Sequence, residues 1–337
     1  MKKLFIVGFL AFALSACDWS TNQEYKSGSF SETPVNFEEI NTEYDDYNST
    51  APSFGETFPL CFSSTRKTNG GTFDIVYKLI TIRFSKDSGK LDIYEETNGN
   101  LDVLSRNGNL VLALNKINTS ADELGPYLIP EEESNDETYQ NGRYNAYTFL
   151  YSTNETGNQD IMFTNNINDA YYETPQEVTF LNSEYDDAYP TFNNDFSKIY
   201  FTSNRASSFD IYSISTDNSK SITDILTGTT SEAVKNSILS SSSDDKCPFV
   251  IRNFMVFASN REGGFGGYDL YYSKFENGQW STPQNFGDKI NTEYDEYRPI
   301  VRIEEGFTND FMLFSSNRPG GLGGFDLYYV GIDNVAY

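Results

Sequence analysis

Short apolar runs separated by polar turns recur along most of the chain. The run KIYFT (Lys198–Thr202) is rich in β-branched and aromatic residues, which predicts a strand. A proline-led apolar stretch, Tyr189–Phe192, precedes it, and the polar segment Asn193–Ser197 between the two predicts a turn. Only Ser231–Leu239 shows a weak helical periodicity. The pattern therefore predicts an all-β fold.

One unusual octet occurs near both ends of this pattern, as INTEYDDY at Ile40–Tyr47 and INTEYDEY at Ile290–Tyr297. Three more copies lie between them, and recurrence at a regular spacing is typical of repeat architectures. Each copy contains two adjacent acidic residues, and in four of the five copies a proline follows after two variable residues. The acidic pairs are Asp45–Asp46, Asp122–Glu123, Asp186–Asp187, Asp244–Asp245 and Asp295–Glu296.

A second signature follows each octet, and it is clearest in FASNREGGFGGYDLYY (Phe257–Tyr272) and FSSNRPGGLGGFDLYY (Phe314–Tyr329). Its Ser-Asn-Arg and Gly-Gly segments predict a turn, because Asn and Gly adopt positive φ at low cost. The Asp-Leu-Tyr-Tyr after the turn predicts a third strand. A polar segment with Thr-Pro, as at Trp280–Pro283, introduces a fourth.

Four short strands in a unit of roughly 50 residues match one blade of a β-propeller. The sequence thus predicts a single propeller over residues 31–337, with five four-stranded blades. The last unit ends at its third strand, Asp326–Val330, so its fourth strand is predicted to come from the N-terminal SETPVNF (Ser31–Phe37). Such a ring has no open edge strands, which explains why the octet occurs at both ends.

An insertion of roughly 30 residues separates the first two units, between Leu79 and Lys116. Its length fits a protruding hairpin. The alternative is a decayed sixth blade that contains Lys90–Tyr94.

The Ser-Asn-Arg-x-Gly-Gly…Asp-Leu-Tyr signature resembles the WD-like β-propeller repeats of the TolB type, which occur in bacterial envelope proteins and are sometimes fused to OmpA-like domains. The resemblance covers roughly residues 31 to 333 and departs from the pattern at the insertion. It implies a propeller and a scaffold function in the cell envelope.

The N-terminus has the pattern of a secretory signal. Lys2 and Lys3 precede an apolar run from Leu4 to Leu14, which is too short to span a bilayer. The following Leu-Ser-Ala-Cys resembles a bacterial lipobox, which implies removal of residues 1–16 and lipidation of Cys17. Residues 17–30 would then be a polar tether, and several acyl chains would hold the protein stably on the outer membrane. The membrane face, periplasmic or cell-surface, stays open.

Composition excludes several classes of function. The net charge of −25 argues against nucleic-acid binding, which needs Lys and Arg at the phosphates. The chain has no histidine, which removes the Ser-His-Asp triad and His-bearing zinc sites. Apart from Cys17, only Cys61 and Cys247 remain, and their places in non-adjacent units favour two buried free thiols over a disulfide.

Two recurring motifs are interpreted as architectural. The GGFGG at residues 263–267 precedes a strand and not a helix, so its glycines are turn residues and not a nucleotide-binding loop. An aspartate that occurs in every unit favours a bond to backbone amides of its own turn. These aspartates are Asp74, Asp160, Asp210, Asp269 and Asp326.

The acidic pairs are the candidate site. First strands line the channel of a propeller. The five pairs named above would then place their carboxylates around one channel mouth, where a negative potential attracts a cation or a basic peptide. Oxygen-only ligands would suit Ca²⁺, although neither a metal nor a cofactor is assigned. The alternative is that each pair caps its own loop.

Two classes of function follow. The first is a non-catalytic, lipid-anchored scaffold that binds an envelope protein; the mutagenesis targets for it are the acidic loop Glu131–Glu137 and the insertion. The second is a carbohydrate-binding or glycoside-processing propeller, because paired carboxylates could cleave glycosidic bonds. A glycosidase places its two acids in different environments, whereas these pairs are near-copies. The sequence therefore favours the scaffold and predicts that the chain is not an enzyme.

Overall fold

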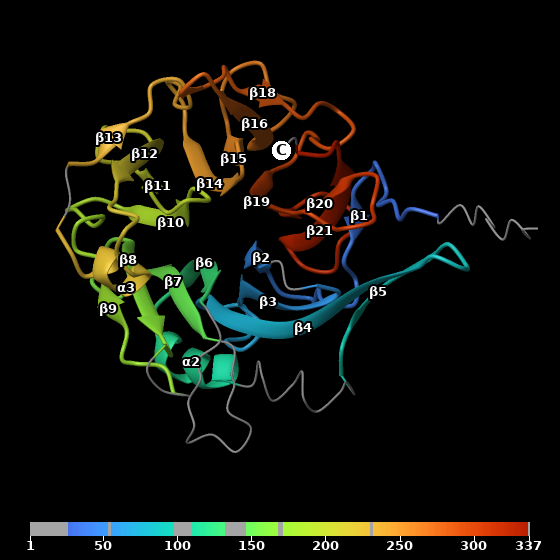
Figure 1. The fold of residues 1–337 in the computed structure, drawn as a ribbon, viewed down its shortest axis with the longest axis horizontal. Helices are drawn as coiled ribbons and strands as arrows, with labels where there is room; N and C mark the ends of the chain where they lie inside the picture. The colour runs from blue at the N-terminus through green and yellow to red at the C-terminus, as the bar shows by residue number, and fades with distance from the viewer. Residues whose placement is uncertain are drawn as a thin grey trace, which may run out of the picture.

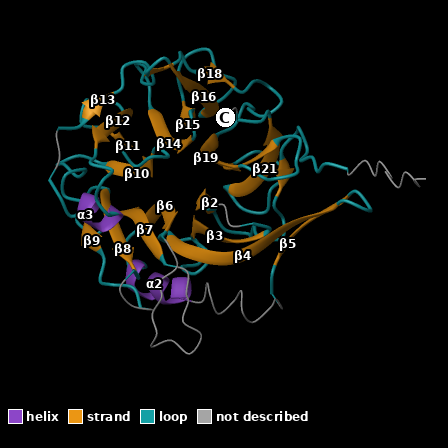
Figure 2. Cartoon of the chain, viewed as in Figure 1, coloured by secondary structure: helices purple, strands orange, loops and turns teal. Residues whose placement is uncertain are grey.

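The computed structural model describes residues 26–52, 55–97, 109–131, 146–167, 171–229 and 232–335. Within these ranges the chain forms five small antiparallel sheets around a central axis, with the first strand of each sheet innermost (Figure 1). Strands dominate and helices are short (Figure 2). The predicted five-bladed, all-β propeller is confirmed. The predicted signal, the tether and Cys17 fall almost entirely outside the described residues.

The strands of each blade follow one another from the axis outward. Blade 1 contains β2 (Asp46–Thr50), β3 (Thr57–Ser64), β4 (Asp74–Ser85) and β5 (Lys90–Glu95). Blade 2 contains β6 (Glu123–Pro130), β7 (Tyr147–Thr153), β8 (Asp160–Asn165) and β9 (Gln176–Glu177). Blade 3 contains β10 (Asp187–Phe192), β11 (Lys198–Ser203), β12 (Asp210–Ser215) and β13 (Val234–Lys235). Blade 4 contains β14 (Asp245–Ile251), β15 (Phe254–Ser259), β16 (Asp269–Glu276), β17 (Gln279–Trp280) and β18 (Gln284–Asn285).

Blade 5 joins the two ends of the chain. It contains β19 (Glu296–Arg302), β20 (Asp310–Ser316), β21 (Asp326–Ile332) and, as its outermost strand, β1 (Val35–Asn36). Val35 pairs with Tyr329 and Asn36 with Tyr328. The predicted closure by an N-terminal strand is confirmed, and the two terminal octets lie in neighbouring blades because the ring closes there.

The insertion between Leu79 and Lys116 extends blade 1. Strands β4 and β5 form a hairpin that projects from the ring (Figure 1), so Lys90–Tyr94 belongs to the fourth strand of blade 1 and not to a sixth blade. The end of the insertion is a helix, α2 (Asn109–Ile117), that packs its buried Leu110 and Ala113 against blades 1 and 2. The predicted hairpin is confirmed, and the helix was not expected. Residues 98–108, and all of the acidic loop except Glu131, lie outside the described part of the chain.

The stretch Ser231–Leu239, which has a weak helical periodicity, contributes a strand and no helix over its described residues. Val234 and Lys235 form β13, which pairs with β12 and completes blade 3. A short helix, α3 (Ile222–Leu226), lies just before it and is capped by the Ser221 hydroxyl, which accepts the N–H of Asp224. Strand β12 pairs with β13 on its outer side, and the hydrogen bonds of this pairing outweigh the weak helical periodicity of the segment.

Aromatic and aliphatic side chains fill the spaces between blades. Cys61 and Cys247 are both free and fully buried in separate clusters of this core, as the sequence predicted. Burial raises the pKa of Cys247 to about 12, which keeps the thiol protonated and unreactive. Among the described residues, no helix has the length and apolarity to cross a bilayer.

Candidate functional site

The first acid of each predicted pair connects neighbouring blades. Its carboxylate accepts the N–H of the residue just before the third-strand aspartate of the preceding blade. These bonds run from Phe325 to Asp45 (2.7 Å), Phe73 to Asp122 (2.9 Å), Gln159 to Asp186 (2.9 Å), Phe209 to Asp244 (3.0 Å) and Tyr268 to Asp295 (2.8 Å). The bond that ends on Asp45 closes the ring. These five acids are therefore structural connections between blades.

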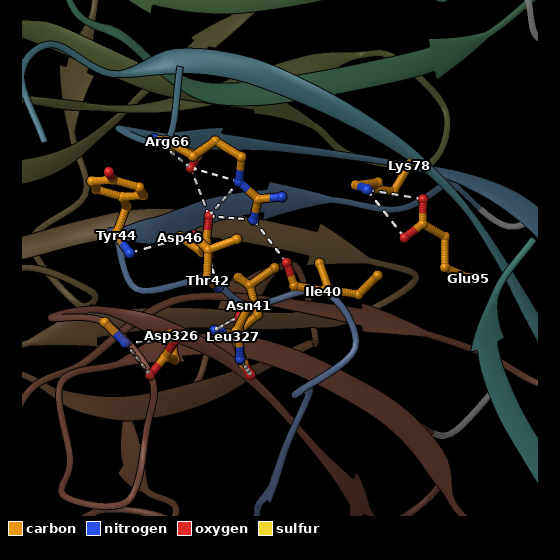
Figure 3. A network of polar contacts seen from close by, with 12 residues as sticks. Ile40, Asn41, Thr42, Tyr44, Asp46, Arg66, Lys78, Glu95, Asp326 and Leu327 are labelled. Atoms are coloured by element: carbon orange, nitrogen blue, oxygen red, sulfur yellow. Dashed lines mark hydrogen bonds and ion pairs between the residues drawn. The ribbon is translucent and has the colours of Figure 1, made fainter. Parts of the chain in front are cut away.

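The second acid of each pair is fully buried. In blade 1 the Asp46 carboxylate accepts from the Arg66 guanidinium at 2.5 Å and from the Thr42 hydroxyl at 2.9 Å, while Arg66 also donates to the Ile40 carbonyl (Figure 3). The same ion pair recurs in three other blades. The pairs are Asp187 with Arg205 (2.5 Å), Asp245 with Arg261, and Glu296 with Arg318 (2.9 Å).

A ring of free carboxylates therefore does not form. The acids predicted to bind a cation or a basic peptide already accept hydrogen bonds from their own and neighbouring blades. In the described ranges, no group of three or more Cys, Asp or Glu side chains has the arrangement of a metal site. The geometry favours the loop-capping alternative, with the second acid buried.

Most of the third-strand aspartates also accept hydrogen bonds from other groups of the protein. Asp269 accepts the N–H groups of Phe265 and Gly266, and Asp326 accepts those of Leu322 and Gly323. For these two residues the predicted bond to backbone amides of their own turn is confirmed. Asp160 accepts the Thr156 hydroxyl instead.

Blade 2 breaks the ion-pair pattern. Its turn has the same geometry, since the Glu155 N–H donates to the Thr153 hydroxyl as the arginine N–H does in the other blades. Glu155 nevertheless stands where the other blades have arginine, and among the described residues the Glu123 carboxyl has only the Thr119 hydroxyl and N–H as donors. Burial, with Asp74 and Asp122 nearby, raises the pKa of Glu123 to about 7. One of the five equivalent acids is thus chemically different.

Restoring the arginine at this turn is expected to stabilise the protein. The raised pKa of Glu123 means that the native state, but not the unfolded state, binds a proton between about pH 4.5 and 7, so stability falls as pH rises through this window. Glu155→Arg should remove the fall and add about 2 kcal/mol at pH 8, after allowance for solvent screening. Urea unfolding at pH 5 and pH 8 measures both effects.

The matched control is Glu155→Gln, which removes the exposed negative charge but supplies no cation. Its stability should stay within about 0.5 kcal/mol of the wild type at both pH values. An equal gain in both variants would contradict the assigned role of the missing arginine.

The axis itself is filled by one residue from each first strand. Every first strand has a register irregularity at this position, where φ is positive. The five residues are Asn48, Gly125, Tyr189, Cys247 and Arg298. Tyr189 contacts non-adjacent blades, because the Asn48 amide donates to its hydroxyl at 3.4 Å and Arg298 lies 5.4 Å from its ring centroid. These side chains close the channel and form a floor.

Among these five axial residues, Gly125 has no side chain because a larger residue would collide with Tyr189. A Cβ there would lie 2.3 Å from Cδ1 of Tyr189, and φ is +58°. Gly125→Ala should therefore lower the free energy of unfolding by about 2 kcal/mol or more. Thermal unfolding measures it, with Gly157→Ala as a control, because Gly157 also has positive φ but no neighbour within 4 Å.

Above this floor lies a set of partly exposed side chains that we call the axial mouth. It consists of the residues just before the five third-strand aspartates, with Tyr47 and Lys246 of the first strands. The five are Phe73, Gln159, Phe209, Tyr268 and Phe325. Tyr47 connects them across blades, with ring centroids 5.8 Å from Phe73 and 4.8 Å from Phe325. The first strands and the turns of four blades thus bring aromatic rings together at one end of the axis.

Polar groups are concentrated on the blade 4 side of the axial mouth. The Lys246 ammonium lies 3.7 Å from the Phe209 ring centroid and 3.9 Å from Oδ2 of Asp244. The Tyr268 hydroxyl donates to the same carboxylate oxygen at 2.8 Å. Burial lowers the pKa of Lys246, and it raises the pKa of Tyr268 with the help of Asp244. A cation, a carboxylate and a phenol therefore meet beside aromatic faces.

This site was not predicted from the sequence. Asp244 was among the predicted residues, but the residues before the third-strand aspartates were not. The available signal was their position in the repeat, where four of the five are aromatic, as in GYDLYY and GFDLYY. The substitution of Glu155 for arginine was also visible as a departure from Ser-Asn-Arg.

Comparison with known proteins gives the fold but no family. No protein-family model and no curated protein matches the chain. A thermostable family-43 glycoside hydrolase shares 12% identity at a TM-score of 0.50, over 85% of this chain and 88% of that one. The catalytic domain of a Coprinopsis cinerea GH62 α-L-arabinofuranosidase has a TM-score of 0.49 at 11% identity, over 90% of this chain and 97% of that one. A Cellvibrio cellulosa α-L-arabinanase complexed with arabinohexaose has a TM-score of 0.48 at 10% identity, over 85% and 91%.

The prediction of a non-catalytic, protein-binding scaffold is wrong by this comparison, and so is the prediction that the chain is not an enzyme. Among the solved structures with this fold are glycoside hydrolases. The sequence argument against an enzyme was that the acidic pairs are near-copies, and Glu123 breaks that equivalence. The resemblance to TolB-type repeats has no counterpart in these comparisons and stays a prediction.

Proposed function

We propose that this chain is a carbohydrate-active propeller that binds a glycan at the axial mouth and cleaves a glycosidic bond there. The observation that carries the proposal is the axial mouth itself, where the rings of Phe209 and Tyr268 from two neighbouring blades lie against Lys246 beside Asp244. A site of this kind, mostly aromatic with a few convergent polar groups and perturbed pKa values, is the usual form of a small-molecule site.

The chemistry of the lining suits a sugar. The apolar faces of Phe209 and Tyr268 can lie against the C–H face of a sugar ring, as flat aromatic surfaces bind other flat apolar faces. The ammonium of Lys246 and the carboxylate of Asp244 can bond to hydroxyl groups at the ring edge. The Lys246 ammonium and the Asp244 carboxylate lie 3.9 Å apart, so their opposite charges offset one another. The site therefore favours a neutral ligand rich in hydroxyl groups over a strongly charged one.

The acid chemistry is supported by blade 2. Hydrolysis of a glycosidic bond needs one carboxyl that is protonated and another that is ionised. Glu123, whose pKa is raised to about 7, is the candidate proton donor, and its N–H donates to the carbonyl of Phe73, a residue of the axial mouth. Glu123 itself is buried, whereas Thr119 is exposed and its hydroxyl lies 2.6 Å from Oε1 of Glu123. We assign the Thr119 hydroxyl as the relay, because it can accept the proton of Glu123 while it donates its own proton to the glycosidic oxygen.

We further propose that the propeller is tethered to the outer membrane through a lipid on Cys17. The Leu-Ser-Ala-Cys sequence and the polar stretch after it support this anchor. Metabolic labelling with a radioactive fatty acid tests it, because Cys17→Ser should abolish incorporation.

Glycan binding is tested with an oligosaccharide array followed by calorimetry on the best ligand. Phe209→Ala should weaken that ligand roughly 10-fold or more, because a buried aromatic contact contributes about 1–3 kcal/mol including its apolar area. The control is Tyr171→Ala, an aromatic residue that is 61% exposed on the outer part of blade 2. Equal weakening by both variants, or no ligand on the array, would reject the axial mouth as the site.

A further inference from the structure

Arg298 is the one buried arginine in the described residues whose charge has no acidic partner. Its side chain is fully buried at the axis, where it donates from Nη2 to the Pro126 carbonyl at 3.2 Å. Nε and Nη1 are buried and have no hydrogen-bond partner in the described part of the chain. The groups around it, Tyr127, Tyr189 and Cys247, are uncharged at neutral pH.

Arg302, on the same strand β19, is a buried arginine that does have an acidic partner. Arg302 is 1% exposed, and its Nη2 lies 2.8 Å from Oε1 of Glu304. It also donates to the carbonyls of Pro52 and Gly55. Its Nε donates to Glu304 at 2.9 Å, so every nitrogen of Arg302 has an acceptor, whereas Arg298 has one weak acceptor for five N–H groups.

The electrostatic cost of Arg298 is large and cannot be avoided by deprotonation. An isolated buried charge is strongly disfavoured, and buried charges in proteins are normally paired. Burial lowers the pKa of Arg298, but a guanidinium stays protonated in proteins at neutral pH. The two donors without acceptors therefore point to an anionic ligand.

We propose that Nε and Nη1 of Arg298 bind a small monovalent anion, chloride under ordinary conditions, on the axis beneath the axial mouth. The full burial of the guanidinium favours a compact ion, and its single positive charge favours a monovalent one. The proposal is independent of glycan binding and of hydrolysis. It assigns the anion a structural role, neutralising the floor on which the axial mouth rests.

The test compares salts on the full chain in detergent. Thermal unfolding is followed from 0 to 200 mM sodium chloride, with sodium gluconate replacing chloride so that ionic strength stays constant. Wild type should show a saturable rise of a few degrees in its unfolding midpoint with chloride and with bromide, because a ligand that binds only the native state stabilises it. Gluconate is too large to enter.

Two variants decide the assignment. Arg298→Met keeps an apolar side chain of similar length and should lose the halide-specific rise. Arg302→Met removes the paired arginine from the same strand, and it should keep the rise even if it unfolds at a lower temperature. Crystals grown in sodium bromide should show an anomalous peak within about 3.5 Å of Arg298 in the wild type.

The same halide response in wild type and Arg298→Met would overturn the proposal. So would equal stabilisation of the wild type by chloride and gluconate, or a bromide crystal without an anomalous peak at Arg298, since ordered water alone would then solvate the guanidinium.

Discussion

Replacing Asp187 by alanine is expected to lower the free energy of unfolding by about 2 kcal/mol or more, because it leaves a partly buried arginine without its partner. The Asp187 carboxylate is fully buried and lies 2.5 Å from the Arg205 guanidinium and 2.6 Å from the Ser183 hydroxyl. The guanidinium lies against the rings of Phe201 and Tyr212, and the Arg205 side chain is 22% exposed, so water solvates the charge only in part. Urea unfolding at pH 7 measures the loss.

The control for this prediction lies in the same loop. Glu184 is exposed, and Glu184→Ala should change stability by no more than about 0.5 kcal/mol. A double variant, Asp187→Leu with Arg205→Met, should recover most of the loss, because an apolar pair of similar volume needs no counter-charge. A loss below about 1 kcal/mol for Asp187→Ala would mean that the buried pairs do not stabilise the blades.

Replacing Glu123 by glutamine is expected to lower the rate of glycosidic cleavage by roughly 10²–10⁴-fold, which is the usual contribution of a positioned general acid. The wild-type rate should also fall as pH rises above about 7, because the donor of raised pKa loses its proton there. Glutamine has the same shape and no proton to donate. The readout is product release from the glycan found on the array, measured between pH 5 and 9.

The matched control is Glu296→Gln, the same substitution at the equivalent position of blade 5. Glu296 is paired with Arg318, so this variant should unfold more easily but keep its rate per folded molecule. Glu123→Gln should instead be as stable as the wild type at pH 8 or more so, since it removes a buried charge without a cationic partner. Retention of the wild-type pH profile by Glu123→Gln would show that another group donates the proton.

The repeat predicted the fold well because each blade is built by local rules. The acidic pair, the Ser-Asn-Arg turn and the Asp-Leu-Tyr strand occur in order, and each needs only its own blade and the neighbouring one to form. The prediction was incomplete where a segment departs from the repeat. The insertion ends in the helix α2 (Asn109–Ile117), which the repeat pattern did not predict.

The acidic pairs illustrate a different limit. Their recurrence in sequence suggested free carboxylates around a channel, whereas in the structure Asp45 accepts from the Phe325 amide and Asp46 from Arg66. A sequence gives the acids and the arginines but not their distances. The functional interpretation of the ring depended on those distances.

The sequence by itself determined the number of blades, the closure of the ring by residues 31–37, the free state of Cys61 and Cys247, and the one turn in which glutamate replaces arginine. These features follow from spacing and residue type along the chain. Only the tertiary structure decided which acids are buried, that Phe209 and Lys246 meet at the axial mouth, and that Arg298 lies unpaired on the axis. These features bring together residues from different blades, and the free energy of a charge depends on neighbours that only the closed ring supplies.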